Sequence, residues 1–458
     1  MLIGFSVSNF RSFRDEQHIS LIASKIVRHK NHVIGTDSKR ILKSGLIFGA
    51  NAGGKSNLVR AVNFSRKIIV NGLDSLDISK SHFRVDNSYY EKPGVFEYRI
   101  FTNGHEYSYG IAISYVNQEI ISEWLYRIDK SRNDFCIYNR NVNENGNSSV
   151  ESDINSTKSK DIQRLFIYLE DFGAGISDLF RKKTILSDIA SRGIVTEGYF
   201  AEISSVFAWF NRLIVIYPGT KFNMINELGS DSKKRPFFQN IMKYLDTGIE
   251  SIDNQEQEFD FDKLFESTPR AEAEKQRADI FKQTAAGPIA IRINDQFVIL
   301  HRNESGSIVY NKLFLNHGNP DDQFEYSDES DGTKRLFDLV PLLYDDMQDH
   351  VILIDEIDRS LHTVLTKKFL ELFFNNTGHN CQLIATTHDI NLLDLDLIRQ
   401  DEIWFVERDE NHSSQLYSLN KYRERFDKKI DKEYLIGRYG AVPNFDDPIL
   451  DEEDSANE

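Results

Sequence analysis

The alternation of apolar and polar positions predicts strands in both halves of the chain. The clearest case surrounds Asn103-Gly104, with Phe96–Phe101 before the pair and Tyr107–Ile113 after it. Asn and Gly both tolerate a positive φ, so this pair between two alternating runs predicts a tight β-hairpin. Similar runs predict strands at 2–8, 19–24, 119–128, 135–138, 289–293, 297–301, 309–314, 402–407 and 415–419.

Helical spacing of apolar residues dominates the middle of the chain. We expect a mainly helical segment from about 161 to 285, with an exposed helix in the charged run 262–283. The spacing of Leu165, Tyr168, Leu169 and Phe172 places them on one face of a helix in this segment. The Asn- and Ser-rich stretch 139–160 predicts a loop, and the basic stretch 28–43 predicts a solvated loop with a nucleic-acid patch as the alternative. No heptad pattern is long enough for a coiled-coil arm.

The stretch Gly49–Ser56 carries the strongest chemical signal. It reads Gly-Ala-Asn-Ala-Gly-Gly-Lys-Ser and fits G-x-x-x-x-G-K-[ST] in full, between the apolar run 46–48 and a helical pattern at 57–62. Glycines let backbone N–H groups close on phosphate oxygens, and the helix start adds positive potential. Lys55 can reach the β- and γ-phosphates, and the Ser56 hydroxyl can bind Mg²⁺. The stretch predicts a nucleoside triphosphate site formed by Ala52, Gly53, Gly54, Lys55 and Ser56.

The apolar run Val351–Ile354 ends in two carboxylates, Asp355 and Glu356. A buried strand places Asp355 at its carboxyl end, where the carboxylate can hold Mg²⁺. Glu356 points elsewhere and can polarise an attacking water. A strand that ends in Asp-Glu is common, so this pair gains its weight from the complete phosphate loop elsewhere in the chain.

Two polar segments flank this carboxylate pair in sequence. The apolar run 383–385 leads into Thr386-Thr387-His388, where His388 can contact a γ-phosphate. Upstream of the carboxylates, Ser330-Asp331-Gly332 opens a helical pattern. A Ser and a Gly at a helix start offer a second anion-binding surface, although Ser-Asp-Gly in isolation is only a turn.

Composition narrows the class of protein. The chain has 458 residues, of which 40% are hydrophobic, enough for a large core and roughly two or three domains. Its formal net charge of −16 argues against a protein that binds DNA over its whole surface. Local basic patches stay as candidate nucleic-acid sites. Cys136 and Cys381 are too few for a disulfide framework and fit a reducing cytosol. No apolar run approaches a membrane span, so we expect a cytoplasmic protein with no membrane partner.

Four elements follow one another along the chain: the phosphate loop, Ser330-Asp331-Gly332, Asp355-Glu356 and His388. Together they resemble the ABC-type ATPase heads of the SMC and Rad-fifty class. They are most similar to the AAA-type ATPase subunits of bacterial anti-phage systems, such as RloA-like proteins and the ATPase half of overcoming-lysogenisation-defect nucleases. The motifs that carry the resemblance are Asn9-Phe10-Arg11-Ser12-Phe13, the phosphate loop with Asn51 and Asn57, Ser330–Thr333, Asp355-Glu356, Ser360-Leu361-His362, His388 and the tail Tyr434–Pro443. Asp331 stands where the usual signature has a glycine.

The resemblance implies an α/β fold: a P-loop NTPase of ABC/SMC-head type with an antiparallel β-rich lobe and a helical insertion. It also implies a homodimer or higher homo-oligomer whose heads pair head to tail. ATP and Mg²⁺ would then lie between the phosphate loop of one copy and Ser330 and Gly332 of the other. The roles that follow are catalysis by Glu356 and His388, metal binding by Ser56 and Asp355, and nucleotide contacts that include Arg11, Asn51 and Asn57.

The function expected from the resemblance is ATP hydrolysis that controls a separate effector in antiviral defence. No block after His388 has the length or acidic constellation of a Toprim nuclease, so a nuclease effector would be a separate chain. The expected parts are 1–150 and 286–445 for the ATPase head, 151–285 for the helical insertion and 446–458 for a disordered acidic tail. The alternatives are a RecF-type DNA-repair clamp, a transporter ATPase subunit and a nucleotide-bound switch with negligible turnover.

Overall fold

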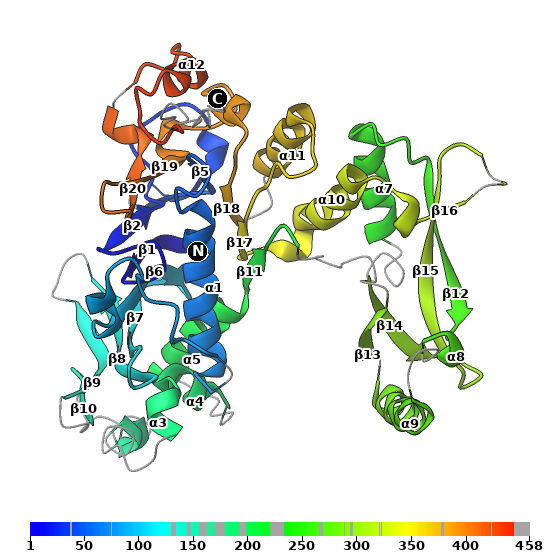
Figure 1. Cartoon of the computed structure of the whole chain (residues 1–458), viewed down its shortest axis with the longest axis horizontal. Helices are drawn as coiled ribbons and strands as arrows, with labels where there is room; N and C mark the ends of the chain where they lie inside the picture. Colours follow the sequence, from blue (N-terminus) through cyan, green and yellow to red (C-terminus); the bar gives the residue numbers. More distant parts are fainter. Residues whose placement is uncertain are drawn as a thin grey trace, which may run out of the picture. The chain divides into compact units, whose positions relative to one another are not determined.

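The chain forms two compact units (Figure 1). Unit 1 comprises Met1–Leu213 and Gln382–Glu458, and unit 2 comprises Ile214–Cys381. The domain boundaries expected after residues 150 and 285 stay predictions, and the expected acidic tail lies outside the described residues. The computed structural model describes residues 1–36, 39–74, 76–129, 134–143, 148–154, 163–165, 167–169, 179–191, 198–219, 233–264, 269–287, 289–293, 296–319, 321, 323–376, 380–422 and 424–443.

A seven-stranded antiparallel sheet forms the β-rich lobe of unit 1, in the order β10-β9-β8-β7-β6-β1-β2. The predicted hairpin at Asn103-Gly104 is confirmed, since β6 and β7 pair from Gly94↔Ile113 to Thr102↔His105. Both turn residues have positive φ, 48° and 78°. The strands are β1 (Leu2–Ser8), β2 (Gln17–Ser20), β6 (Gly94–Thr102), β7 (His105–Ser114), β8 (Glu119–Ile128), β9 (Phe135–Val142) and β10 (Ser148–Glu151).

A second sheet in unit 1 is built around β5 (Ser44–Phe48). This strand lies between β18 (Gln382–Thr386) and β19 (Ile403–Arg408) and runs parallel to both. The antiparallel strand β20 (Ser414–Ser418) pairs with β19. Every residue of β5 and β18 is buried, as expected for strands covered on both faces. Helix α1 (Lys55–Asn71) follows β5 and buries one apolar face.

The described part of unit 1 also contains β3 (Val33–Thr36), β4 (Lys39–Leu42), α3 (Leu179–Lys182), α4 (Ile185–Ser191), α5 (Tyr199–Asn211) and α12 (Ile430–Leu435). The loop prediction for 139–160 is wrong in part, because this stretch contains the end of β9 and all of β10. Asn and Ser, which the sequence pattern assigns to loops, here occupy positions on an exposed sheet edge.

The basic stretch 28–43 is also not a solvated loop. It contains the β3–β4 hairpin, and two of its basic side chains, His32 and Arg28, contact acidic partners late in the chain. His32 is buried, with Nδ1 2.9 Å from Glu402 Oε2, and Arg28 forms an ion pair with Asp396 at 2.7 Å. These contacts attach the stretch to the rest of unit 1 and give His32 and Arg28 acidic partners that the sequence alone does not predict.

A buried carboxylate fixes α4 to the β-rich lobe. Glu123 is fully buried and accepts hydrogen bonds from the N–H groups of Ile185 (2.7 Å) and Leu186 (3.3 Å). It also accepts from the hydroxyls of Tyr109 (3.1 Å) and Tyr138 (2.9 Å). Burial raises the pKa of the Glu123 carboxyl and holds the pKa of both tyrosines well above the usual value. The carboxylate thus joins a strand to the first turn of a helix.

Unit 2 contains an antiparallel sheet in the order β12-β15-β14-β13, with β16 paired to β15. Its strands are β12 (Ser251–Glu258), β13 (Ile289–Ile293), β14 (Gln296–Arg302), β15 (Ile308–Asn316) and β16 (Phe324–Glu325), and β11 (Leu213–Ile216) neighbours β17 (Val351–Ile354). Its helices are α7 (Lys234–Tyr244), α8 (Phe261–Leu264), α9 (Arg270–Ala286), α10 (Asp331–Leu339) and α11 (Thr363–Asn375).

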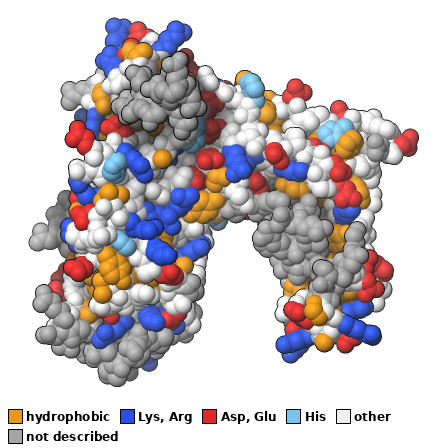
Figure 2. All heavy atoms as spheres, viewed as in Figure 1, with side chains coloured by type: hydrophobic (Ala, Val, Ile, Leu, Met, Phe, Trp, Pro, Cys, Tyr) orange, Lys and Arg blue, Asp and Glu red, His pale blue; other side chains and the backbone are white. Residues whose placement is uncertain are grey.

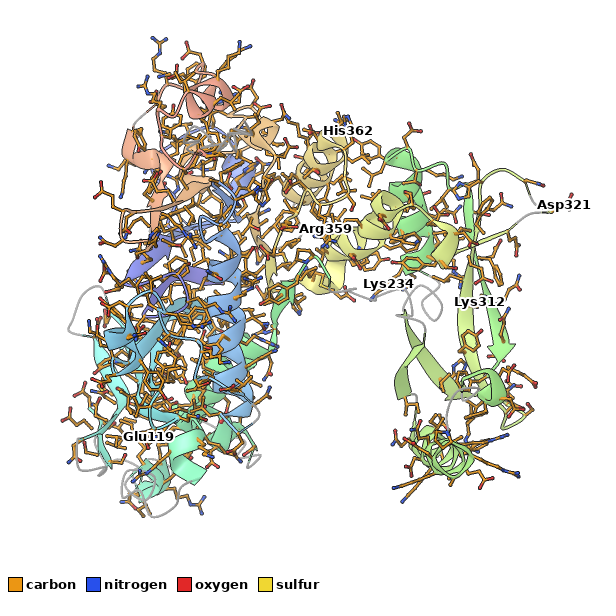
Figure 3. All side chains as sticks on the ribbon, viewed as in Figure 1. Glu119, Lys234, Lys312, Asp321, Arg359 and His362 are labelled. Carbon is orange, nitrogen blue, oxygen red and sulfur yellow. The ribbon has the colours of Figure 1, made fainter. Side chains whose placement is uncertain are left out.

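The stretch 161–285, expected to be mainly helical, contains α3, α4, α5, α7, α8 and nearly all of α9 among its described residues, together with the strands β11 and β12. The exposed helix expected in 262–283 is present as α9, whereas Phe172 lies outside the described residues. The basic triplet 233–235 opens α7, and Lys234, labelled in Figure 3, forms an ion pair with Asp346 at 2.5 Å.

Candidate nucleotide site

The phosphate loop joins the end of β5 to the start of α1 and is closely backed by neighbouring strands. Gly49 and Gly54 have positive φ, 155° and 117°, a conformation that favours glycine. A Cβ at Gly49 would collide with the Val406 carbonyl oxygen of β19, and one at Gly54 with the Ser414 hydroxyl of β20. The glycines of the motif are therefore required by backbone conformation and by close approach.

Lys55 is buried at the base of this loop, with 4% of its surface exposed. Its Nζ donates to the carbonyl oxygens of Gly49 (2.6 Å) and Ala50 (3.0 Å), so the ammonium lies inside the loop. The N-cap of α1 is Gly54, and no side chain caps the helix. A buried ammonium beside an uncapped helix N-terminus suits a phosphate group.

The residues around the loop differ in how their side chains are used. Asn51 and Ala52 are exposed, and Ser56 is half-buried. Arg11 is exposed, with its guanidinium 5.6 Å from the centroid of the Phe10 ring. Lys and Arg side chains gather over α1 on the face shown in Figure 2, which favours an anionic ligand.

The Asn57 amide is engaged within the protein. Its Nδ2 donates to Ser12 Oγ (2.8 Å), and its Oδ1 accepts from Arg60 (3.2 Å). Ser12 in turn lies 2.7 Å from the hydroxyl of Ser414, which also contacts the Gly53 carbonyl at 2.7 Å. Sequence reasoning gave no role to Ser414, because a lone serine on a strand late in the chain carries no signal that it meets the loop.

His388 follows β18, beside the strand that leads into the loop. The neighbouring Thr387 is buried and donates its backbone N–H to the Ile47 carbonyl of β5 at 3.1 Å, whereas His388 itself is exposed. Parallel strands end at the same edge of a sheet. Unit 1 therefore places His388 at the edge of the sheet from which the phosphate loop also starts.

In unit 2, the two candidate carboxylates follow the fully buried strand β17. Asp355 is 2% exposed, and its N–H donates to the Ile216 carbonyl at 2.9 Å. Glu356 is half-buried and has a φ of 55°, which non-glycine residues rarely adopt. A strained backbone at a candidate catalytic residue is a feature typical of functional sites.

An arginine from α10 supports this turn. Arg335 is 6% exposed, and its Nη2 donates to the Glu356 carbonyl at 3.1 Å. Burial lowers the pKa of the Arg335 guanidinium, and Asp338 lies 3.9 Å away. The arginine was not among the residues that the sequence pattern selected, and it fixes the backbone of Glu356.

The signature-like residues begin α10 and lie against the segment that follows Glu356. Ser330 is the N-cap, and its Oγ accepts from the Thr333 N–H at 3.1 Å. A Cβ at Gly332 would lie 2.9 Å from the Ser360 carbonyl oxygen, so only glycine allows this approach. Arg359 and His362 of the same segment are labelled in Figure 3, and His362 caps α11.

The candidate site residues thus fall into two groups, each assembled inside one unit. Arg11, Lys55, Ser56 and His388 belong to unit 1, and Ser330, Gly332, Asp355 and Glu356 belong to unit 2. A site that joins the two groups stays a prediction. In the described part of the chain, no group of three or more His, Cys, Asp or Glu side chains could hold a metal. None of the described helices combines the length and the hydrophobicity that a membrane span requires.

A family model described as "AAA domain, putative AbiEii toxin, Type IV TA system" matches residues 46–164 and 195–394. The chain belongs to this AAA-domain family. The matched ranges contain the phosphate loop, Asp355-Glu356 and His388, and the α/β P-loop NTPase fold with an antiparallel β-rich lobe is confirmed. No protein of curated description matches this AAA-domain protein.

Among solved structures, the protein is similar to SMC head domains at low identity. The SMC head domain from Thermotoga maritima is 13% identical, with 91% of this chain and 98% of that chain covered and a TM-score of 0.37. An SMC head bound to the C-winged helix domain of ScpA is 15% identical, with 92% and 99% covered and a TM-score of 0.39. A head with an extended coiled coil bound to the C-terminal domain of ScpA, derived from Pyrococcus furiosus, is 15% identical, with 92% and 97% covered and a TM-score of 0.38.

Proposed function

We propose that this AAA-domain protein binds and hydrolyses ATP and that nucleotide-dependent pairing of two copies controls a separate effector in antiviral defence. The geometry of the phosphate loop carries the proposal. Its glycines are closed against β19 and β20, its lysine is buried at 4% exposure, and its helix lacks a side-chain cap. This combination is suited to a triphosphate.

The chemical roles follow from the side chains. Lys55 leaves the Gly49 and Ala50 carbonyls and neutralises the β- and γ-phosphates, while the N–H groups at the start of α1 bind phosphate oxygens. The hydroxyl of Ser56 and the carboxylate of Asp355 are oxygen ligands of the kind that Mg²⁺ prefers, and the ion when bound offsets phosphate charge. Glu356 orients and polarises the attacking water, and His388 contacts the γ-phosphate.

The proposed site is shared between copies. Ser330 and Gly332 open α10, whose N-terminus is a second anion-binding surface, and Ser330 is exposed. We place ATP between the phosphate loop of one copy and this helix start of the other, in a homodimer or higher homo-oligomer. The family description names a putative toxin of a type IV toxin–antitoxin system, which supports a role in defence. The RecF-type clamp is not favoured.

Steady-state ATP hydrolysis and ATP binding by the full chain test the chemical part. Lys55→Ala should lose binding and turnover, whereas Glu356→Gln should bind ATP and lose turnover by at least about 100-fold. Lys67→Ala is the matched control, since Lys67 is an exposed lysine on the same helix. Hydrolysis that is unchanged in both test variants would overturn the ATPase assignment.

The biological part has a separate test. Deleting the gene together with its neighbours should increase phage sensitivity, and restoring the set with Glu356→Gln should not rescue it. A phage sensitivity that does not change on deletion contradicts the defence role and leaves the ATPase assignment standing.

A further inference from the structure

Three polar side chains from distant parts of unit 1 meet behind the phosphate loop. Ser12 follows β1, Asn57 lies in the first turn of α1, and Ser414 opens β20. Ser414 is fully buried, and Ser12 is 8% exposed. The backbone reinforces the contact, because the Ser414 N–H donates to the Ser12 carbonyl at 2.7 Å.

The donors and acceptors of these contacts can be assigned. The Asn57 amide donates to Ser12 Oγ at 2.8 Å. The Ser414 hydroxyl lies 2.7 Å from both the Gly53 carbonyl and Ser12 Oγ and donates to each, so it shares its single proton between them. Asn57 thus positions Ser12, Ser12 positions the Ser414 hydroxyl, and Ser414 holds the Gly53 carbonyl in a chain of contacts.

This chain fixes the orientation of one peptide group in the loop. The C=O and N–H of a trans peptide point in opposite directions. Holding the Gly53 carbonyl against Ser414 therefore turns the Gly54 N–H away from β20. Gly54 is the N-cap of α1 and has a φ of 117°, so its conformation is not fixed by a side chain of its own.

We propose that Ser12, Asn57 and Ser414 act as positioning residues that preset the phosphate loop for nucleotide. The proposal rests on the nucleotide site assigned above and gives Asn57 a supporting role behind the loop. Each side chain fixes the position of the next, so removing any member loosens the hold on the Gly53 carbonyl. None of the three side chains needs to touch the nucleotide for this effect.

Calorimetric titration of the full chain with Mg-ADP tests the proposal without turnover. Ser414→Ala and Ser12→Ala should each weaken ADP binding roughly tenfold, the effect of losing one buried hydrogen bond. Because the two hydroxyls act in series, the double variant should bind ADP about as well as either single variant. Ser418→Ala, on the same strand but outside the chain of contacts, is the control, with a change below about twofold.

The outcomes separate this proposal from the nucleotide assignment. If the wild type fails to bind Mg-ADP and Mg-ATP, the nucleotide site itself is wrong. If the wild type binds and Ser414→Ala binds equally well, the positioning role is wrong. Losses that multiply in the double variant contradict a chain in series. Should Ser414→Ala fail to fold, Ser12→Ala compared with Ser12→Thr decides, since only Thr keeps the hydroxyl and should restore binding.

Discussion

The two groups of site residues are supported in different ways. In unit 1, the phosphate loop is held by residues far away in sequence: Val406 and Ser414 lie behind Gly49, Gly53 and Gly54. In unit 2, Glu356 is held by Arg335, only 21 residues earlier. Positive φ values occur in both groups: the phosphate loop has them at Gly49, Gly54 and also Ala52 (60°), and unit 2 has one at Glu356 (55°).

The difference suggests a division of roles. Long-range support makes the phosphate loop part of the folding core of unit 1, so damage there should reduce stability together with binding. The Glu356 turn is supported locally, so it contributes less to the stability of the fold. Substitutions there should reduce ATP turnover more than the free energy of unfolding. The following substitutions test this contrast.

The largest effect is expected for Gly49→Ala. The new methyl group would collide with the backbone carbonyl of Val406, which cannot move without shifting β19. We expect a loss of about 3 kcal/mol in the free energy of unfolding, together with loss of nucleotide binding. Gly104→Ala is the control, because its φ is also positive, at 78°, but its Cβ would meet nothing within 4 Å. The control should cost about 1 kcal/mol in a urea titration.

A smaller loss is expected for Glu123→Gln in the β-rich lobe of unit 1. The amide replaces one of the two oxygens that accept from the start of α4 and from Tyr109 and Tyr138. Leaving buried donors unpaired should cost about 2 kcal/mol in urea unfolding. Glu151→Gln, at an exposed position on β10, should change stability by less than about 0.5 kcal/mol. Equal losses in the two variants would contradict the anchoring role.

The same carboxylate predicts a pH dependence. Burial raises the pKa of Glu123 in the folded protein, so the folded state binds this proton more tightly than the unfolded state. As pH falls through the raised folded pKa, the wild type should therefore gain stability relative to Glu123→Gln. Urea titrations of both proteins at about pH 8 and pH 5 measure this difference. A difference that shrinks at the lower pH would contradict the raised pKa.

The smallest effect on stability is expected for the double variant Arg335→Met with Asp338→Leu in unit 2. Replacing both members of a buried ion pair by apolar side chains of similar volume is often close to neutral, so we expect a change below about 1 kcal/mol. The Glu356 carbonyl loses its donor, and kcat should fall about tenfold while KM stays within about twofold. Lys368→Met with Glu371→Leu is the control, because it replaces an ion pair on α11 whose side chains are 43% and 42% exposed. A stability loss as large as that of Gly49→Ala would remove the contrast between the units.

The sequence was sufficient where the signal is local. The phosphate loop, the Asn103-Gly104 hairpin and the buried strand before Asp355 follow from spacing and residue type, and the structure contains each of them. It was insufficient where partners lie far apart. Ser414 gains its role only when β20 meets the loop, and His32 gains its partner only when Glu402, the residue before β19, lies beside it. The left-handed conformation of Glu356 could not be predicted either, because no glycine marks that position in the sequence.

The most direct test of the account is complementation between two inactive chains. Lys55→Ala removes the phosphate loop half of the shared site, and Ser330→Arg blocks the signature half. If ATP lies between copies, each mixed dimer retains one intact composite site, and mixing the variants should restore a part of the wild-type ATP hydrolysis that neither variant has alone. A mixture as inactive as its parents, with mixed dimers verified by differential tagging, would contradict a shared site whose two halves act independently.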